Sequence, residues 1–206
     1  VLNNIIEISN ETEIGGNYAR KLLKAFILDA KKNRYYNWNE LLIYCKYSAN
    51  PVGRFVIDMS YYIEKKPQKN INSIYQASDK LCSSLQILNH VQDCQDDFLK
   101  LNRVYIPENL ITKFSCSINI LKSKKSNKNF KKLKVEIIKN IENLLKDCKS
   151  GLKKIDVWQL RKETLIIFHI ARKLCYLLKT EDPLEKKVKL SRIDLIFCFL
   201  KGIIGI

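Results

Sequence analysis

Apolar residues recur along most of this chain at the spacing of an α-helix. The clearest stripe runs at intervals of three or four residues through Phe130, Leu133, Ile137, Ile141, Leu144 and Cys148. At about 3.6 residues per turn these side chains share one face, so the pattern predicts an amphipathic helix with a buried side. Gly151 follows the stripe and predicts the end of that helix.

The same periodicity and the turn residues divide the rest of the chain. Asn10, with Glu13 three residues later, predicts the N-cap of the first helix, and Ser191 predicts the cap of the last. Pro51 is expected to interrupt or kink a helix. No internal repeat or long linker is visible, so we predict one all-α domain over residues 1–206. The expected helices cover about 11–32, 38–49 resuming to 64, 74–99, 130–151, 156–179 and 192–206, with loops at 65–72 and 122–132.

The predicted helix over 74–99 carries a polar stripe. Gln86, Asn89, Asp93 and Asp97 are spaced three, four and four residues apart, and fall within an arc of roughly 80° on a helix. Two carboxylates and two amides on one face suit a hard cation such as Mg²⁺. The alternative is an ordinary solvated face, which spacing alone favours. Arg103, at the helix exit, favours a site because it can fork onto phosphate oxygens.

Composition excludes some functions. The net charge is +16, carried by 37 Lys and Arg of which only seven are Arg. Such charge suits nucleic acid, an anionic membrane or phosphorylated substrates, but no clustered Arg with interleaved aromatics is present, so we predict no nucleic-acid partner. Seven scattered Cys without a CxxC pair indicate reduced core thiols in a cytoplasmic protein.

The C-terminal stretch Ile193–Ile206 is apolar but short, and Asp194 and Lys201 interrupt it. It is too short to span a bilayer. The expected alternatives are a last packing helix or a surface anchor. A surface anchor implies peripheral membrane contact, at the inner face of the membrane.

Two motifs resemble those of a known family. Gln86–Pro107 reads QILNHVQDCQDDFLKLNRVYIP, and its Q-x-x-N-x-x-x-D-x-x-x-D and R-x-Y-x-P order resembles the second aspartate-rich motif of the squalene/phytoene synthase family. Tyr44–Gly53 reads YCKYSANPVG and resembles the family's Y-C-x-x-x-A-x-x-V-G helix. The sequence of Ser48–Arg54 is most similar to that of the bacterial hydroxysqualene synthases of hopanoid pathways.

The resemblance implies an isoprenoid-synthase-type helical bundle that encloses a prenyl chain and clamps a diphosphate through Mg²⁺. Asp93 and Asp97 would then be metal ligands. Gln86 and Asn89 would hold the metal cluster or the diphosphate, with Asn89 contributing to catalysis. Arg103 would bind phosphate oxygens or pin the aspartates.

The Tyr44–Gly53 motif receives roles by the same resemblance. Tyr44 would offer its hydroxyl or ring to the diphosphate or a carbocation, or be a half-buried core residue. Ala49 and Gly53 would let a prenyl chain, or simply another helix, approach closely. Arg54 would reach the diphosphate or cap its helix.

The branch resemblance implies conversion of presqualene diphosphate to hydroxysqualene with release of diphosphate. The alternatives are a squalene or phytoene synthase that condenses two prenyl diphosphates, and a non-catalytic scaffold. Other squalene-pathway enzymes are candidate partners. The family's first aspartate motif is not found before Tyr44, so we expect an N-terminally incomplete chain that lacks its first helices and is inactive alone.

Overall fold

The computed structural model describes residues 14–205, and within them the only strand-like pairing is an isolated bridge between Arg34 and Val104. The prediction of an all-α chain is therefore confirmed. The elements are α2 (Ile14–Lys31), α3 (Trp38–Ser48), α4 (Asn50–Ile63), α5 (Ile71–Gln92), α6 (Cys94–Leu101), α7 (Glu108–Lys113), the short 3₁₀ helix η1 (Ile118–Lys122), α8 (Lys128–Leu152), α9 (Trp158–Thr180) and α10 (Arg192–Ile204).

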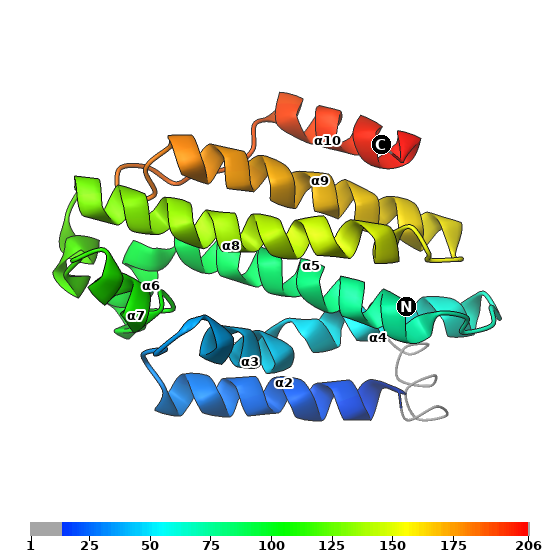
Figure 1. Ribbon diagram of the computed structural model, residues 1–206. Coiled ribbons are helices and arrows are strands. Elements are labelled where there is room, and N and C mark those ends of the chain that lie inside the picture. Colours follow the sequence, from blue (N-terminus) through cyan, green and yellow to red (C-terminus); the bar gives the residue numbers. More distant parts are fainter. Residues whose placement is uncertain (1–13, 206) are drawn as a thin grey trace.

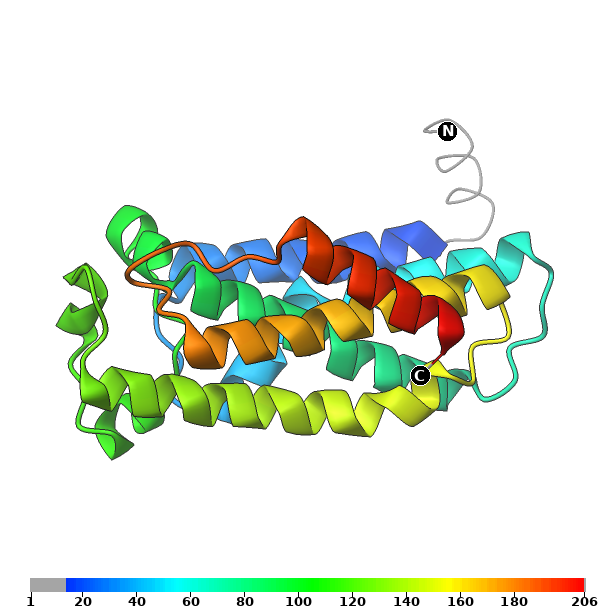
Figure 2. The ribbon, with the colours of Figure 1, turned by 90° about the horizontal axis from the view of Figure 1, so that it is seen from above.

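The long helices form a stack. In Figure 1, α2 with α3 and α4 lies at one edge, α5 and α8 lie in the middle, and α9 and α10 form the other edge. Contacts follow the same order, since α5 packs on α4 and α8, and α9 packs on α8 and α10. Seen from above in Figure 2, α8 and α9 run along the length of the bundle. One core therefore lies between these layers.

The predicted stripe on α8 faces that core. Phe130, Leu133, Ile137 and Ile141 are at most 2% exposed. Burying a side chain of this kind contributes about 1.5–3 kcal/mol. One member was assigned wrongly, because Leu144 is only half-buried whereas Leu145 is 1% exposed.

α8 ends at Leu152, one residue after Gly151, so the predicted end of this helix is confirmed. Gly151 itself lies in the last helical turn. A Cβ at this position would lie 2.5 Å from the Ala77 Cβ and 2.9 Å from the Ser73 carbonyl oxygen. The glycine is therefore needed because α8 approaches α5 closely here.

The break between α3 and α4 confirms the interruption predicted at Pro51, which lies in the first turn of α4. The single helix predicted over 74–99 is wrong. α5 ends at Gln92, and Asp93 (φ −101°, ψ 12°) joins it to α6. Asp is a weak helix former because its side chain competes for nearby backbone groups. The candidate metal ligands therefore lie on a broken helix.

Other boundaries differ in detail. The loop predicted over 122–132 is shorter than expected, because α8 already begins at Lys128 and the Asn127 side chain accepts a 2.9 Å hydrogen bond from the Phe130 amide. Ser191 caps α10 as predicted, in a full capping box with Asp194. The cap predicted at Asn10 lies outside the described residues.

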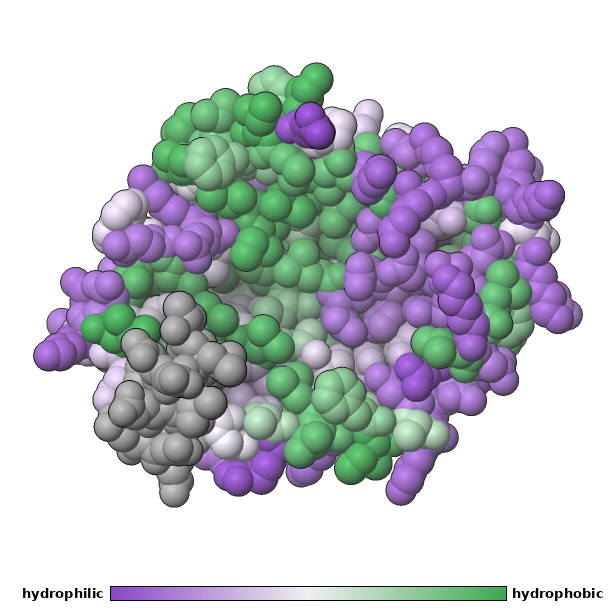
Figure 3. Space-filling view, turned by 180° about the vertical axis from the view of Figure 1, so that it is seen from behind, coloured by the Kyte–Doolittle hydropathy of each residue, from purple (hydrophilic) through white to green (hydrophobic). Residues whose placement is uncertain are grey.

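α10 leaves much of its apolar surface uncovered. Figure 3 shows the face opposite to Figure 1, where apolar surface extends from the region of α10 into a hollowed centre. Within residues 14–205, no helix is long and apolar enough to cross a membrane. The exposed apolar side chains of α10 are Ile193, Leu195, Ile196, Phe197, Phe199, Leu200, Ile203 and Ile204.

Candidate functional site

Gln86 and Asp97 lie on either side of His90, a residue that the motif spacing did not indicate. The His90 Nδ1 is 3.4 Å from Asp97 Oδ2, and its Nε2 is 3.1 Å from the Gln86 side-chain nitrogen. The His90 side chain is 13% exposed and that of Asp97 20%. The half-buried imidazole therefore connects two of the predicted site residues.

Asp93 pairs with a residue far along the chain. Its Oδ1 is 3.3 Å from the Nζ of Lys187, in the segment between α9 and α10. The same segment and the end of α5 line a pocket of about 240 Å³ that includes Asp93 and Asp96. Asn89 is exposed one turn before Asp93. The structure thus adds a cation beside the carboxylate stripe.

The two carboxylates fit a magnesium ion that also binds phosphate. Asp93 Oδ2 and Asp97 Oδ1 make no hydrogen bond or ion pair with other residues of 14–205, so one oxygen of each is available. No group of three or more His, Cys, Asp or Glu in that range could hold a metal. Mg²⁺ is usually held by one or two carboxylates, substrate phosphates and water. The donors present suit that arrangement.

Tyr44 lies in the core of the site and is 3% exposed. Its hydroxyl donates to Asp29 Oδ2 over 3.0 Å, and the Tyr105 hydroxyl donates to Asp29 Oδ1 over 2.9 Å. Burial raises the pKa of Tyr44 well above its usual value and that of Tyr105 to about 12. Both phenols therefore keep their protons at neutral pH and act as donors to Asp29.

Tyr105 joins the two sequence motifs. Its ring stacks on the His90 imidazole with centroids 3.5 Å apart and planes at 16°, and its centroid is 5.3 Å from that of Tyr44. Tyr35 stacks on Tyr105 at 5.4 Å. The backbone brings these rings together because the Val104 amide donates to the Asn33 carbonyl over 2.9 Å.

Arg54 is engaged by a carboxylate. Its Nε and Nη2 donate to the two Asp79 oxygens at 2.9 and 2.6 Å, and its guanidinium lies 4.9 Å from the centre of the Tyr75 ring. A bidentate pair of this kind holds the side chain in one orientation. Arg54 therefore binds a carboxylate of α5, which differs from the alternative role as a helix cap. The predicted contact of Arg54 with diphosphate stays a prediction.

Gly53 and Ala49 are placed by helix packing. A Cβ on Gly53 would lie 2.4 Å from Ser78 Oγ and 2.5 Å from Cys82 Sγ, so α4 and α5 are in close contact there. Ala49 forms the junction between α3 and α4. The structure thus shows that Gly53 allows close packing of two helices. Contact of Gly53 or Ala49 with a prenyl chain stays a prediction.

The backbone of Arg103 contacts the carboxylate stripe, since its amide donates to the Asp97 carbonyl over 3.0 Å. The side chain is half-buried and makes no hydrogen bond or ion pair with other residues of 14–205. Its positive charge opposes the rise in the pKa of Tyr35 and Tyr105 that burial causes. Arg103 is therefore close to the tyrosine cluster and available to an anion.

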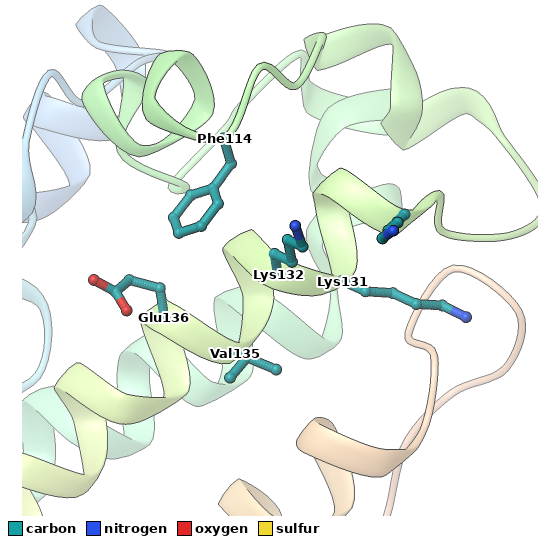
Figure 4. Close-up of a pocket in the computed structure, with 6 residues that line it drawn as sticks. Phe114, Lys131, Lys132, Val135 and Glu136 are labelled. Carbon is teal, nitrogen blue, oxygen red and sulfur yellow. The ribbon is translucent and has the colours of Figure 1, made fainter.

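A pocket of about 560 Å³ lies elsewhere, beside the first half of α8 (Figure 4). Phe114 and Val135 contribute apolar surface, while Lys131 and Lys132 extend from α8. None of the predicted site residues lines this pocket. The candidate site is defined by the motif residues and not by this cavity.

A comparison with protein families matches most of the chain. The profile of the family described as squalene/phytoene synthase matches residues 1–194. The chain belongs to the squalene/phytoene synthase family. Solved structures show the same all-α fold: a dehydrosqualene synthase in complex with ligand has a TM-score of 0.77 at 19% identity, covering 90% of this chain and 63% of that one.

Curated relatives indicate the branch. Hydroxysqualene synthase of Sinorhizobium fredii is 38% identical over 87% of this chain, and that of Rhodopseudomonas palustris is 35% identical over 87%. The chain spans 59% of the length of each. Squalene synthase HpnC from Alicyclobacillus acidocaldarius has a TM-score of 0.60 at 23% identity, covering 78% of this chain and 60% of that one. These relatives therefore carry the name of the branch of the family that the sequence motifs resembled.

Sequence reasoning missed three residues of this candidate site. Asp29 has no spacing that relates it to the aspartate motif, and Lys187 is one of many lysines. His90, one turn after Gln86 and seven residues before Asp97, could have been found by asking which side chain reaches both.

Proposed function

We propose that this chain forms part of a Mg²⁺-dependent isoprenoid synthase that converts presqualene diphosphate to hydroxysqualene and releases diphosphate. The observation that carries the proposal is the pair Asp93 and Asp97, each with one available carboxylate oxygen. Lys187 pairs with Asp93, and the Arg103 amide donates to the Asp97 carbonyl. Curated relatives at 38% and 35% identity bear the name hydroxysqualene synthase.

The first task of the site is to make diphosphate a good leaving group. Asp93 and Asp97 would hold Mg²⁺, which supplies neutralising charge to the diphosphate. Gln86 and Asn89 would direct amide groups toward the same cluster, while Arg103 and Lys187 would bind phosphate oxygens. The carbon–oxygen bond to the diphosphate then breaks, and both electrons leave with the diphosphate.

The second task is to control which nucleophile reacts with the resulting carbocation. Apolar surface around the reacting carbon would exclude bulk water. Tyr44 would present its ring and its neutral phenol oxygen, since its proton is directed to Asp29. One water would add its oxygen to the rearranged cation and lose a proton, giving the alcohol.

Two other functions remain as alternatives. A condensing squalene or phytoene synthase would use the same diphosphate clamp on two prenyl diphosphates. A non-catalytic scaffold would have no need of two carboxylates with available oxygens, so Asp93 and Asp97 argue against it.

The test is to give the protein that carries this chain presqualene diphosphate and Mg²⁺ in heavy-oxygen water, and to analyse the lipid product by mass spectrometry. Hydroxysqualene that carries the heavy oxygen is the expected product. Squalene formed only with NADPH, or product formed only from two shorter prenyl diphosphates, would favour the condensing enzymes. No product from either substrate would favour the scaffold.

We also propose that the exposed apolar face of α10 lies on an anionic bilayer at the inner face of the membrane. Lys189, Arg192 and Lys201 are exposed on or next to this helix, which suits acidic headgroups. Co-sedimentation with phosphatidylglycerol vesicles should fall for Phe197→Ser and not for Phe26→Ser, an equally exposed apolar residue on α2. Equal binding by both variants, or no preference over phosphatidylcholine, would contradict the proposal.

A further inference from the structure

Asp29 is the only described residue whose carboxylate joins both sequence motifs. Its Oδ2 accepts the hydroxyl of Tyr44, from the Tyr44–Gly53 motif, and its Oδ1 accepts that of Tyr105, from the Gln86–Pro107 motif. Hydrogen bonds to an ionised acceptor are stronger than neutral ones. With both oxygens occupied, Asp29 fixes the relative position of the two rings.

The contact chain continues from Tyr105 to the aspartate motif. The Tyr105 ring lies on the His90 imidazole at 3.5 Å, and His90 Nδ1 is 3.4 Å from Asp97 Oδ2. His90 is also held by Gln86 at 3.1 Å. A displacement of the Tyr105 ring would therefore move the His90 imidazole and, through it, the Asp97 carboxylate. This connection does not depend on the backbone between α5 and α6.

We propose that Asp29 is a positioning residue, which holds Tyr44 directly and, through Tyr105 and His90, sets the orientation of the Asp97 carboxylate. The proposal rests on the proposed role of Asp97 in holding Mg²⁺ and diphosphate. Asp29 itself reaches no substrate: its two oxygens are already occupied by phenols. Its effect on the site is therefore indirect.

The bundle contains a matched control for this arrangement. Asp58 on α4 also accepts two tyrosine hydroxyls, from Tyr18 at 2.6 Å and from Tyr75. It has no contact with either Asp93 or Asp97. Replacing either aspartate by asparagine leaves a single amide oxygen to accept from two phenols, so both variants should unfold about 3–12 °C lower.

The distinguishing measurement is the NMR signal of the His90 ring. The chain has only two histidines, so a His90→Gln variant assigns the signal. Asp29→Asn should shift the His90 ring protons, because the Tyr105 ring moves, and should weaken binding of Mg²⁺ with inorganic diphosphate, by calorimetry, about tenfold. Asp58→Asn should leave both measurements unchanged.

Unchanged His90 signals in Asp29→Asn, or equal shifts in both variants, would overturn the proposal. A shift of His90 without loss of diphosphate binding would also overturn it, because Asp97 would then be positioned independently. If the unmodified protein binds no Mg²⁺–diphosphate, the proposed function fails, and the His90 signals alone decide the positioning of the imidazole by Asp29.

Discussion

The Asp93 carboxylate and the Lys187 ammonium form an ion pair of 3.3 Å between the α5–α6 junction and the segment after α9. The Lys187 side chain is 71% exposed and that of Asp93 32%. A pair this exposed contributes little to stability, because water and salt screen it. Its importance lies in placing a positive charge next to the proposed diphosphate position.

Lys187→Met should weaken binding of Mg²⁺ with inorganic diphosphate about three- to tenfold, measured by calorimetry, while the free energy of unfolding in urea changes by less than about 0.5 kcal/mol. Lys186→Met is the control, since Lys186 is equally basic but pairs with Glu181 at 3.0 Å. Equal losses of affinity in the two variants would show that general charge, and not the contact with Asp93, is responsible.

Gly53→Ala should lower the free energy of unfolding by about 1–3 kcal/mol, because its Cβ would meet Ser78 Oγ and Cys82 Sγ at 2.4 and 2.5 Å. Gly16→Ala on α2 should be neutral or stabilising, because its nearest neighbour would be the Arg20 side chain at 3.7 Å. Urea unfolding measures both. A Gly53→Ala protein of unchanged stability would contradict the close contact of α4 and α5.

The segment that carries Lys187 is held by Asp182. Its carboxylate accepts the Ser126 hydroxyl at 2.6 Å, the Ser126 amide at 2.8 Å and the Leu184 amide at 3.0 Å. Burial opposes ionisation, but these hydrogen bonds outweigh it and hold the pKa of Asp182 below its usual value. The resulting stability is present above the unfolded pKa and is lost as pH falls through the folded pKa.

Asp182→Asn should therefore unfold about 1.5–3 kcal/mol more easily than the unmodified protein at neutral pH. The difference should shrink as the pH falls below about 4, where the carboxyl becomes protonated in the unfolded chain. Urea unfolding at several pH values measures it, with the exposed Asp147→Asn as control. A difference that is constant over this range would refute the role given to the ionised carboxylate.

Local signals predicted much of the fold. Ser191 and Pro51 each sit at a helix start as expected, because capping and the missing proline amide act within a few residues. The interruption at Asp93 was missed because apolar periodicity continues across it, with Val91 and Cys94 both buried. Gly151 marked the end of α8, but its packing against Ala77 was not predicted because the two residues are distant in sequence.

The site was predictable only where its residues share one motif. Helical spacing indicated Gln86 and Asp97, although the helix breaks at Asp93 between them. Asp29, by contrast, lies 15 residues from Tyr44 and 76 from Tyr105. Nothing in the local pattern relates such residues, because the contact arises from the packing of the 33–36 segment against 104–109. The ion pair of Lys187 depends in the same way on where α9 ends.

The most direct test of the central claim compares Asp97→Asn with Asp147→Asn in turnover of presqualene diphosphate. Asp147 is exposed, lies on α8 and pairs with Lys80 at 3.3 Å, so it offers the same substitution outside the candidate site. The account predicts that Asp97→Asn loses at least about 100-fold in turnover, as when a group that stabilises transition-state charge is removed, and that Asp147→Asn keeps full turnover. Equal turnover by the two variants would contradict the assignment of Asp97 to the diphosphate clamp.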